Sequence, residues 1–335
     1  MSRDALFIAW TGFQRRQISM APHCGFETVF FAVPRHTSRL AKLLLYLRHG
    51  METWKLLRAR GPAVVWVQLP QVPLLWVALA YRMLSKHTVR VVADCHNAQL
   101  RPPWSSFPLA RWALRRADVV LVHNDAMHSA ALELGWATQT LRVLEDVPPQ
   151  GMSGPPSGLA RKVIPLGKPW VVFPGSFAAD EPVREVLEAA RLAPELGFIL
   201  TGALQTARRN GHPVDSLPPN VVLPGFLPTD VFEDLLRDAD VILGLTRFEG
   251  IQLSVCNEAL GFARPLVTAN TSVLRTLFGQ AAVLVDANDP ASIAQGCRQA
   301  FAESPARSMA SAELAQTRLV KWLQGPLSAV KLLLR

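Results

Sequence analysis

Two glutamates, Glu249 and Glu258, lie nine positions apart in a segment that reads TRFEGIQLSVCNEALGFARPLV. The segment follows an apolar run, and its pattern places the start of a helix near Ser254, between the two carboxylates. Free amides at a helix N-terminus, beside Gly250, can bind phosphate, and carboxylates bind the hydroxyls of ribose or a sugar. The spacing leaves an alternative open, in which Glu258 only favours the helix dipole and Glu249 is a solvated loop residue.

The balance of charge points to an anionic partner. The 335-residue chain has a formal net charge of +9. Most of its basic residues are arginines, which can donate two hydrogen bonds to one phosphate. The partner could be nucleic acid, a phosphorylated substrate or an anionic membrane surface. Because the sequence has no zinc-finger spacing, no basic region before heptads and no aromatic RNA-binding motif, we expect no nucleic-acid partner.

The cysteines give no sign of metal or redox chemistry. Cys24, Cys95, Cys256 and Cys297 are far apart, and no pair has CxxC spacing. We therefore expect reduced, buried thiols, no metal site and no cofactor. The opening residues, MSRDALFIAW, lack the long apolar stretch of a signal peptide, so we expect a cytoplasmic location.

Residues 63–81 are uncharged and about as long as a membrane span. Pro70 and Pro73 interrupt them, and two prolines in a lipid-exposed helix would leave backbone groups without partners. We therefore expect a buried strand, a proline turn and a buried helix instead.

Valine-rich runs without alternation are typical of parallel strands covered on both faces, and helical patterns separate them here. The predicted strands are residues 5–10, 64–67, 89–93, 119–122, 170–173, 198–200, 220–223, 241–245, 266–268 and 282–285. The predicted helices of the second half begin near Pro182, Thr229, Ser254, Ser272 and Pro290. This alternation predicts an α/β fold.

A segment rich in proline, glycine and serine, residues 148–169, separates the two halves. We expect an N-terminal domain over residues 1–150, a linker over 151–168 and a C-terminal domain over 169–310. Residues 311–335 are helical in pattern, with an interruption at Gly325 and Pro326, and would pack back on the first domain. Two Rossmann-like, doubly wound domains would turn the carboxyl ends of their strands toward a shared cleft, where ligands bind in this architecture.

The string EGIQLSVCNEALGFARPLV resembles the signature E-G-x-x-L-x-x-x-E-A-x-x-x-G-x-P-V-V of the large GT-B family of nucleotide-sugar-dependent glycosyltransferases, which includes bacterial glycan and phosphatidylinositol mannosyltransferases. The preceding NVVLPGFLPTDVFEDLLRDADVILGLT is similar to the strand, Gly-Phe turn, helix and Ala-Asp-Val strand that lead into that signature. The resemblance implies that Glu258 holds the ribose hydroxyls and that Glu249 is a catalytic residue facing the sugar. The further donor-binding residues that it implies are Thr246, Arg247, Gly250, Ile251, Gln252 and Leu253, with Gly225 and Phe226 beside the base.

The resemblance in the first half is looser. Gly12 lies where the family's first loop approaches the diphosphate, and His96 lies where many members place a catalytic histidine near the sugar. A core histidine bonded to the backbone is the alternative for His96. Arg15 and Arg16 are candidates for acceptor or phosphate contacts, or else form a solvated basic turn. Asp94 is a conceivable inverting base, while the resemblance favours retention.

The sequence departs from the family in three places. Ala263 replaces a glycine, which matters only if the backbone there needs a positive φ, and the two glutamates are one residue further apart. The loop PGSFAADEPVR lacks the arginine and Lys-Gly with which many members bind the diphosphate. Since the leaving diphosphate gains negative charge, another cation must take over. Arg247, Arg15 and Arg16 are the candidates, and Ser176 could donate one hydrogen bond.

A possible membrane contact lies in residues 36–60, where apolar side chains recur at helical spacing among basic ones. This pattern predicts a basic amphipathic face suited to an anionic membrane surface. Plain core packing is the alternative, and Gly50 would split the helix. The apolar positions are Leu40, Leu43, Leu44, Leu47, Met51 and Trp54, and Arg111, Arg115 and Arg116 add positive charge.

Together these features predict a metal-independent glycosyltransferase that moves a hexosyl group from a UDP- or GDP-sugar to a hydroxyl of a lipid-linked or cell-envelope glycan. We expect it in the cytoplasm or peripherally on the inner face of the cytoplasmic membrane. Two alternatives stay open. One is a nucleotide-sugar epimerase of the same fold, and the other is a non-catalytic, transferase-like binding subunit, which the missing lysine motivates.

Overall fold

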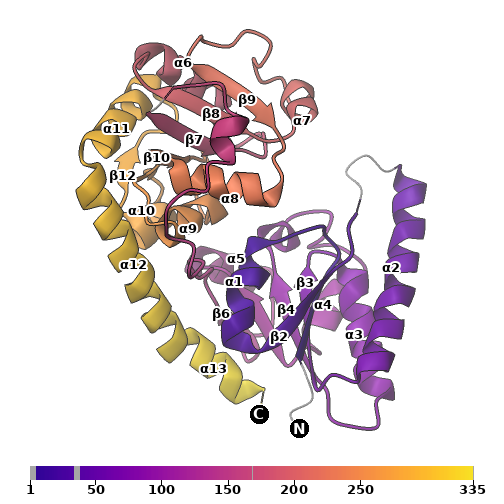
Figure 1. Ribbon diagram of the computed structural model, residues 1–335. Coiled ribbons are helices and arrows are strands. Elements are labelled where there is room, and N and C mark those ends of the chain that lie inside the picture. The colour runs from indigo at the N-terminus through magenta and orange to yellow at the C-terminus, as the bar shows by residue number, and fades with distance from the viewer. Residues whose placement is uncertain (1–4, 34–37, 168, 335) are drawn as a thin grey trace. The chain divides into compact units, whose positions relative to one another are not determined.

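The computed structural model describes residues 5–33, 38–167 and 169–334, which form two compact units (Figure 1). Unit 1 comprises the chain up to Val147 together with the residues from Val320 onward, and unit 2 comprises Pro148–Leu319. Each unit is built on a six-stranded parallel sheet with helices packed against it. The prediction of an α/β fold with two doubly wound sheets is therefore confirmed.

The sheet of unit 1 has the strand order β2-β1-β3-β4-β5-β6. Its strands are β1 (Ala5–Ala9), β2 (Phe26–Phe30), β3 (Val64–Leu69), β4 (Arg90–Cys95), β5 (Val119–Val122) and β6 (Leu141–Val143). Four of these strands follow the predicted valine-rich runs. The sequence did not reveal β2 and β6, which lie at the two edges of the sheet, where only one neighbour is needed and the apolar run can be short.

Helices cover the sheet of unit 1 and supply its longest packed surfaces. They are α1 (Arg15–Cys24), α2 (Arg39–Arg60), α3 (Val72–Leu84), α4 (Ala110–Leu114), α5 (Asp125–Glu133) and α13 (Pro326–Leu333), with a 3-10 turn η1 (Asn97–Leu100). Residues 63–81 form β3 and most of α3, as predicted, and no helix among the described residues has the length and apolarity needed to cross a membrane.

The prediction that Gly50 splits its helix is wrong, because α2 runs without a break from Arg39 to Arg60. A glycine inside a helix costs only about 1 kcal/mol, which the packing of a 22-residue helix can offset. The position also faces a neighbour: a Cβ on Gly50 would lie 3.7 Å from Val77 Cγ2 on α3.

The sheet of unit 2 has the order β12-β11-β10-β7-β8-β9. Its strands are β7 (Trp170–Pro174), β8 (Gly197–Thr201), β9 (Val221–Gly225), β10 (Val241–Gly244), β11 (Leu266–Ala269) and β12 (Val283–Val285). All six lie where the sequence predicted them. Counted within the unit, the order is 3-2-1-4-5-6 read from the β9 edge, so the direction of winding reverses between β7 and β10. The carboxyl ends of these two strands therefore flank the crevice where doubly wound sheets bind ligands.

Five helices of unit 2 begin where the sequence indicated: α6 (Val183–Leu192), α8 (Thr229–Asp238), α9 (Ser254–Gly261), α10 (Ser272–Phe278) and α11 (Pro290–Ala302). The sequence did not indicate α7 (Leu204–Arg209). The helix α12 (Ser304–Gln324) follows and continues into unit 1. The proline-rich segment before β7 is attached to unit 2, because Asp234 of α8 accepts hydrogen bonds from the amides of Ser157 and Ala160.

Candidate functional site

The predicted donor segment begins at the carboxyl end of β10 and is tied there to the loop between β7 and α6. Thr246 is fully buried, and its hydroxyl donates a 2.7 Å hydrogen bond to Asp180 Oδ2. The amide of Arg247 donates to the Asp180 carbonyl oxygen at 2.9 Å. The two loops that flank the reversal point of the sheet are therefore joined, and the donor segment starts from a fixed position.

Glu249 lies three residues after Thr246 and contacts the start of α10. Its Oε2 accepts hydrogen bonds from the amide of Ser272 at 2.9 Å and from the Ser272 hydroxyl at 2.6 Å. These bonds hold the pKa of Glu249 below its usual value. Glu249 is exposed, so the alternative of a solvated loop residue stays open, and its carboxylate is oriented by the helix that follows β11.

Glu258 is the fifth residue of α9 and is only 7% exposed. It lies beyond the first turn, and Leu253 at the N-cap makes no side-chain capping bond. The alternative in which Glu258 serves the helix terminus therefore does not fit. Burying the Glu258 carboxylate costs free energy that an apolar residue at the same position would not cost. This favours a binding role for Glu258.

The residues between the two glutamates form the loop into α9. Gly250 has φ +74°, a left-handed conformation that favours glycine, while Ile251, Gln252 and Leu253 are all partly buried. Thr246, Arg247 and Glu249, which precede this loop, and the ends of β11 and β12 surround a polar cavity of about 320 Å³. Its lining residues include Thr246, Arg247, Glu249, Asn270, Asp286 and Asn288. Three of the predicted site residues thus line one cavity at the carboxyl edge of the sheet.

Ala263, where the signature has glycine, does adopt a positive φ, of +52°. The turn is a Schellman motif: the Ala263 amide donates to the Leu260 carbonyl at 3.0 Å, and the Arg264 amide donates to the Ala259 carbonyl at 2.9 Å. The replacement of glycine by Ala263 therefore matters, because the backbone there has the positive φ that favours glycine. The Ala263 methyl group is strained at the position that ends α9.

Arg247, the first candidate for the missing cation, is engaged by its own unit. Its Nη2 forms an ion pair with Glu185, Nη1 donates to the Glu181 carbonyl oxygen at 3.0 Å, and Nε donates to Asn288 Oδ1 at 3.1 Å. Its charge is therefore directed at α6. A phosphate role for Arg247 stays a prediction, and it would require exchange of Glu185 for the ligand.

Ser176 does not present a free hydroxyl. Its Oγ donates a 2.6 Å hydrogen bond to Glu181 Oε1, and its amide donates to the same oxygen at 2.9 Å. Burial raises the pKa of Glu181 although the hydrogen bonds from Ser176 and Phe177 oppose the rise. The loop that the resemblance assigns to the diphosphate thus holds an internal carboxylate.

Gly225 and Phe226, the residues expected beside the base, end β9 at the opposite edge of the sheet. Gly225 has φ +82°, and the Phe226 ring is 74% exposed. An exposed aromatic ring at a carboxyl edge is suited to stacking on a base. Within unit 2, β9 is separated from β10 by β7 and β8, so these two residues do not line the polar cavity.

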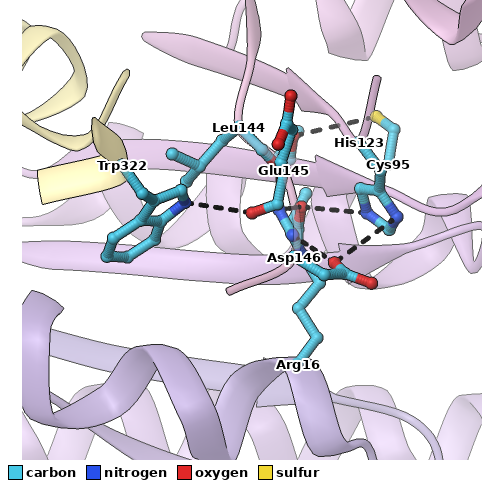
Figure 2. Close-up of polar contacts among 9 residues, drawn as sticks. Arg16, Cys95, His123, Leu144, Glu145, Asp146 and Trp322 are labelled. Atoms are coloured by element: carbon cyan, nitrogen blue, oxygen red, sulfur yellow. Dashed lines mark hydrogen bonds and ion pairs between the residues drawn. The ribbon is translucent and has the colours of Figure 1, made fainter. Parts of the chain in front are cut away.

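In unit 1, Arg16 lies in a buried polar cluster with Asp94, His123 and Asp146. The guanidinium donates to both oxygens of Asp94, from Nε at 2.9 Å and from Nη2 at 3.0 Å, and Nη1 pairs with Asp146 Oδ1. Figure 2 shows the Arg16 side chain extending toward Asp146, with the His123 ring beside that carboxylate. Arg16 is only 6% exposed, so the alternative of a solvated basic turn is wrong for this residue.

The charges of Arg16, Asp94 and Asp146 compensate one another within the cluster. Burial alone would lower the pKa of Arg16, but Asp94 and Asp146 raise it above its ordinary value. Burial would raise the pKa of Asp94, but Arg16 and His123 hold it far below its usual range. An inverting base must accept a proton, so a carboxylate this strongly acidified is poorly suited to that role.

His96 and His123 adjoin at the carboxyl ends of β4 and β5. Their ring centroids are 5.7 Å apart with the planes nearly perpendicular, and the His96 side chain is exposed whereas His123 is 7% exposed. The alternative of a core histidine stays open for His96, because desolvation lowers the pKa of this ring to about 4 although the side chain is exposed. Sequence reasoning missed His123 and Asp146, although each follows a strand of the sheet, which is the one signal that could have found them.

Gly12 and Arg15 lie in the turn after β1. Gly12 is exposed, and a Cβ there would meet only Ala32 Cβ at 3.8 Å, so the backbone does not require glycine. The Arg15 guanidinium lies 5.2 Å from the centre of the Phe13 ring. Neither residue lies in the buried cluster, and their contacts with a ligand stay predictions.

A large apolar groove follows α2 and α3, which lie side by side (Figure 1). Its volume is about 870 Å³. Among its lining residues are Trp10, Leu43, Leu47, Met51, Trp54 and Trp76, with Lys42 and Lys55 also lining it. Three of the predicted stripe residues, Leu43, Leu47 and Met51, are more than half exposed, so core packing does not account for them. The described residues contain no group of three His, Cys, Asp or Glu that could hold a metal ion.

Comparison with known proteins finds a family match for the second half of the chain and a similar fold for the whole of it. Residues 168–303 match the family described as Glycosyl transferases group 1. Sucrose-phosphate synthase from Thermosynechococcus elongatus has a similar structure, with a TM-score of 0.72 and 13% identity over 98% of this chain and 99% of that one. No curated protein matches the chain.

Two further structures are similar. Anabaena HepE in complex with UDP and glucose has a TM-score of 0.71 and 14% identity, covering 98% of this chain and 99% of that one. A putative UDP-N-acetylglucosamine 2-epimerase from Listeria monocytogenes has a TM-score of 0.55 and 14% identity, covering 94% and 91%. The segment with the donor signature lies within the matched residues 168–303, and the chain as a whole shares the two-unit fold of these structures.

Proposed function

We propose that this protein is a glycosyltransferase that takes its sugar from a UDP- or GDP-sugar and transfers it to a hydroxyl of a lipid-linked or cell-envelope glycan. The observation that carries the donor half of the proposal is the placement of Glu249, Thr246 and Arg247 around one polar cavity at the carboxyl ends of β10, β11 and β12. HepE, which has the same fold, was solved with UDP-glucose, and this supports a nucleotide sugar as the donor class.

The proposed roles follow from position. Glu258, buried in α9, accepts hydrogen bonds from the ribose hydroxyls, and Glu249 faces the transferred sugar from the cavity wall. His96, exposed at the end of β4, is proposed as a catalytic residue that acts on the sugar. We expect retention of anomeric configuration and no resident metal, with protein groups meeting the charge of the leaving nucleotide.

The acceptor half of the proposal rests on the apolar groove between α2 and α3. Its walls are almost entirely apolar, so it suits a hydrocarbon chain, and Lys42 and Lys55 can pair with an anionic group of the same molecule. Each buried methylene of such a chain would contribute about 0.8 kcal/mol. We propose that the exposed leucines of α2 next to the groove contact an anionic membrane surface, with the enzyme bound peripherally on the cytoplasmic face.

The donor class is tested by binding of UDP and GDP to the parent and to Glu258→Gln, measured by calorimetry. Losing hydrogen bonds to a charged carboxylate costs about 1.5–3 kcal/mol, so we expect roughly 10- to 150-fold weaker binding. Glu313→Gln, an exposed substitution on α12, is the matched control and should bind as the parent does. Equal affinity of the parent and Glu258→Gln for both nucleotides would refute the donor-site model.

A screen of sugar nucleotides by thermal unfolding would then identify the donor. A ligand at a 100-fold excess over its dissociation constant stabilises the protein by about 2.7 kcal/mol. The epimerase alternative has its own observation, the similar fold of the Listeria protein, and is tested by product analysis without acceptor. An epimerised nucleotide sugar would favour the epimerase, and failure of every sugar nucleotide to bind would favour the non-catalytic subunit.

A further inference from the structure

The loop between β7 and α6 wraps around the carboxylate of Glu181. The Ser176 amide and hydroxyl donate to Oε1 at 2.9 Å and 2.6 Å, and the Phe177 amide donates to Oε2 at 2.7 Å. Every one of these contacts is a donor aimed at an oxygen. Successive backbone amides that converge in this way form a nest, which is a binding site for anions such as phosphate.

The nest is held in a conformation that the chain would not adopt by default. Phe177 has φ +55°, in the left-handed region that a bulky residue rarely enters, and its ring is fully buried. Asn210 Nδ2 donates to the Phe177 carbonyl oxygen at 2.7 Å, which fixes the peptide on the other side. A Cβ on Gly202 would lie 2.3 Å from the Gly175 carbonyl oxygen, so the neighbouring turn packs directly against the loop. Strain that is fixed so firmly points to a functional position.

The position of the nest is where a donor phosphate would be expected. It follows β7, and the Asp180–Thr246 hydrogen bond joins it to the donor segment after β10, so it borders the reversal point of the sheet. The charged groups around the nest disfavour the binding of a further anion. The Arg247 guanidinium pairs with Glu185, and the Asp180 and Glu181 carboxylates lie in the loop itself.

We propose that Glu181 determines specificity by acting as the resident anion of this nest, so that the loop does not bind the diphosphate of a sugar nucleotide. The proposal rests on the proposed function, since it concerns how the donor is held. The nucleoside and the sugar then provide the affinity, through the neighbourhood of Glu258 and the polar cavity. The missing lysine is explained as part of the same change, because a lysine beside this carboxylate would have no phosphate to bind.

The first test uses inorganic pyrophosphate, which probes the nest without a nucleoside. We expect weak binding by the parent and at least about tenfold tighter binding by Glu181→Ala, which leaves two amides and a hydroxyl free. Glu188→Ala on α6 removes the same charge from an exposed position and should bind as the parent does. If Glu181→Ala bound pyrophosphate no better than Glu188→Ala, the proposal would be overturned.

Loss of the loop's hydrogen bonds could prevent Glu181→Ala from folding, and a second variant covers that case. Glu181→Gln keeps the size and one acceptor of the side chain while giving up its charge, so we expect tighter pyrophosphate binding with a native circular-dichroism spectrum. Binding at the parent's level by a folded Glu181→Gln would count against a resident anion.

The second test compares UDP with uridine, and GDP with guanosine. For whichever base binds, we expect the parent to hold the nucleoside and its diphosphate with affinities within about threefold of each other, and Glu181→Ala to prefer the diphosphate at least about tenfold. A parent that strongly prefers the diphosphate refutes the inference while leaving the proposed function intact. If no nucleotide binds any variant but Glu181→Ala gains pyrophosphate binding, the proposed function fails, and the result supports only the occupation of the nest by Glu181 and not its role in donor specificity.

Discussion

The contribution of the buried Arg16 of unit 1 to the free energy of unfolding can be tested directly. Arg16 neutralises Asp94 and Asp146, which are 1% and 8% exposed, and it also donates to the Leu144 carbonyl oxygen at 2.8 Å. Replacing Arg16 with alanine leaves both carboxylates buried without this cation. Removing one partner of a buried ion pair typically costs about 3–5 kcal/mol. We expect Arg16→Ala to lie in that range at pH 7.

The loss of stability in Arg16→Ala should depend on pH, and the two aspartates determine the direction of this dependence. In the parent, the folded-state pKa values of Asp94 and Asp146 are depressed, so their stabilisation is present above the unfolded pKa of about 3.9 and is lost as the pH falls through the folded values. Without Arg16, burial raises the pKa values of both aspartates, so they become protonated as the pH falls and no longer destabilise the variant as buried charges. The difference in free energy of unfolding between the parent and Arg16→Ala should therefore narrow from pH 7 to pH 4.

Urea unfolding followed by tryptophan fluorescence is suited to this measurement. Of the nine tryptophans, all except Trp170 belong to unit 1, so the signal reports mainly the unit that carries the substitution. Arg101→Ala, at an exposed position of the same unit, is the control and should change stability by less than about 0.5 kcal/mol. A loss below about 1 kcal/mol for Arg16→Ala, or a gap that does not change with pH, would refute this account of the cluster.

Three further predictions concern other parts of the chain. Ala263→Gly should raise the free energy of unfolding by about 0.5–1 kcal/mol, because glycine relieves the positive φ of the Schellman turn, and an unchanged or lower value in urea unfolding would contradict the strain. Ala80→Phe, which fills the apolar groove, should raise the KM for a lipid-linked acceptor at least about tenfold and leave UDP or GDP binding unchanged; equal KM values would remove the groove from acceptor binding. Leu44→Glu should weaken co-sedimentation with anionic vesicles relative to Leu192→Glu, an equally exposed leucine of unit 2, and equal sedimentation would exclude α2 as the membrane face.

The sequence predicted the strands of unit 2 better than those of unit 1, for a physical reason. A central parallel strand must be apolar on both faces, which leaves a readable run such as Val241–Gly244. At an edge, β2 includes Glu27 and β6 includes Arg142, so neither leaves such a run, whereas the edge strand β12 is apolar throughout. The prediction that Gly50 splits its helix was wrong because intrinsic helix propensity contributes less to stability than tertiary packing does.

The candidate site was predictable where it is local in the sequence and unpredictable where it is not. Glu249, Glu258 and the loop between them belong to one continuous segment with a recognisable pattern. The partners of Arg16 are 78 and 130 positions away, and no pattern in the turn after β1 indicates them. The same holds for Arg247, whose partner Glu185 is 62 positions earlier in the chain. Which arginine is free and which is paired depends on the fold.

The attachment of the last helices has a consequence for how the chain is made. Trp322 is 4% exposed and its indole N–H donates to the Glu145 carbonyl oxygen at 3.0 Å, next to Asp146 of the polar cluster (Figure 2). Leu327 and Val330 of α13 are buried in the same unit. On the ribosome, unit 2 is synthesised in full before these residues emerge. Unit 1 is therefore completed only after unit 2 has been synthesised, and the surface that Trp322, Leu327 and Val330 cover stays open until then.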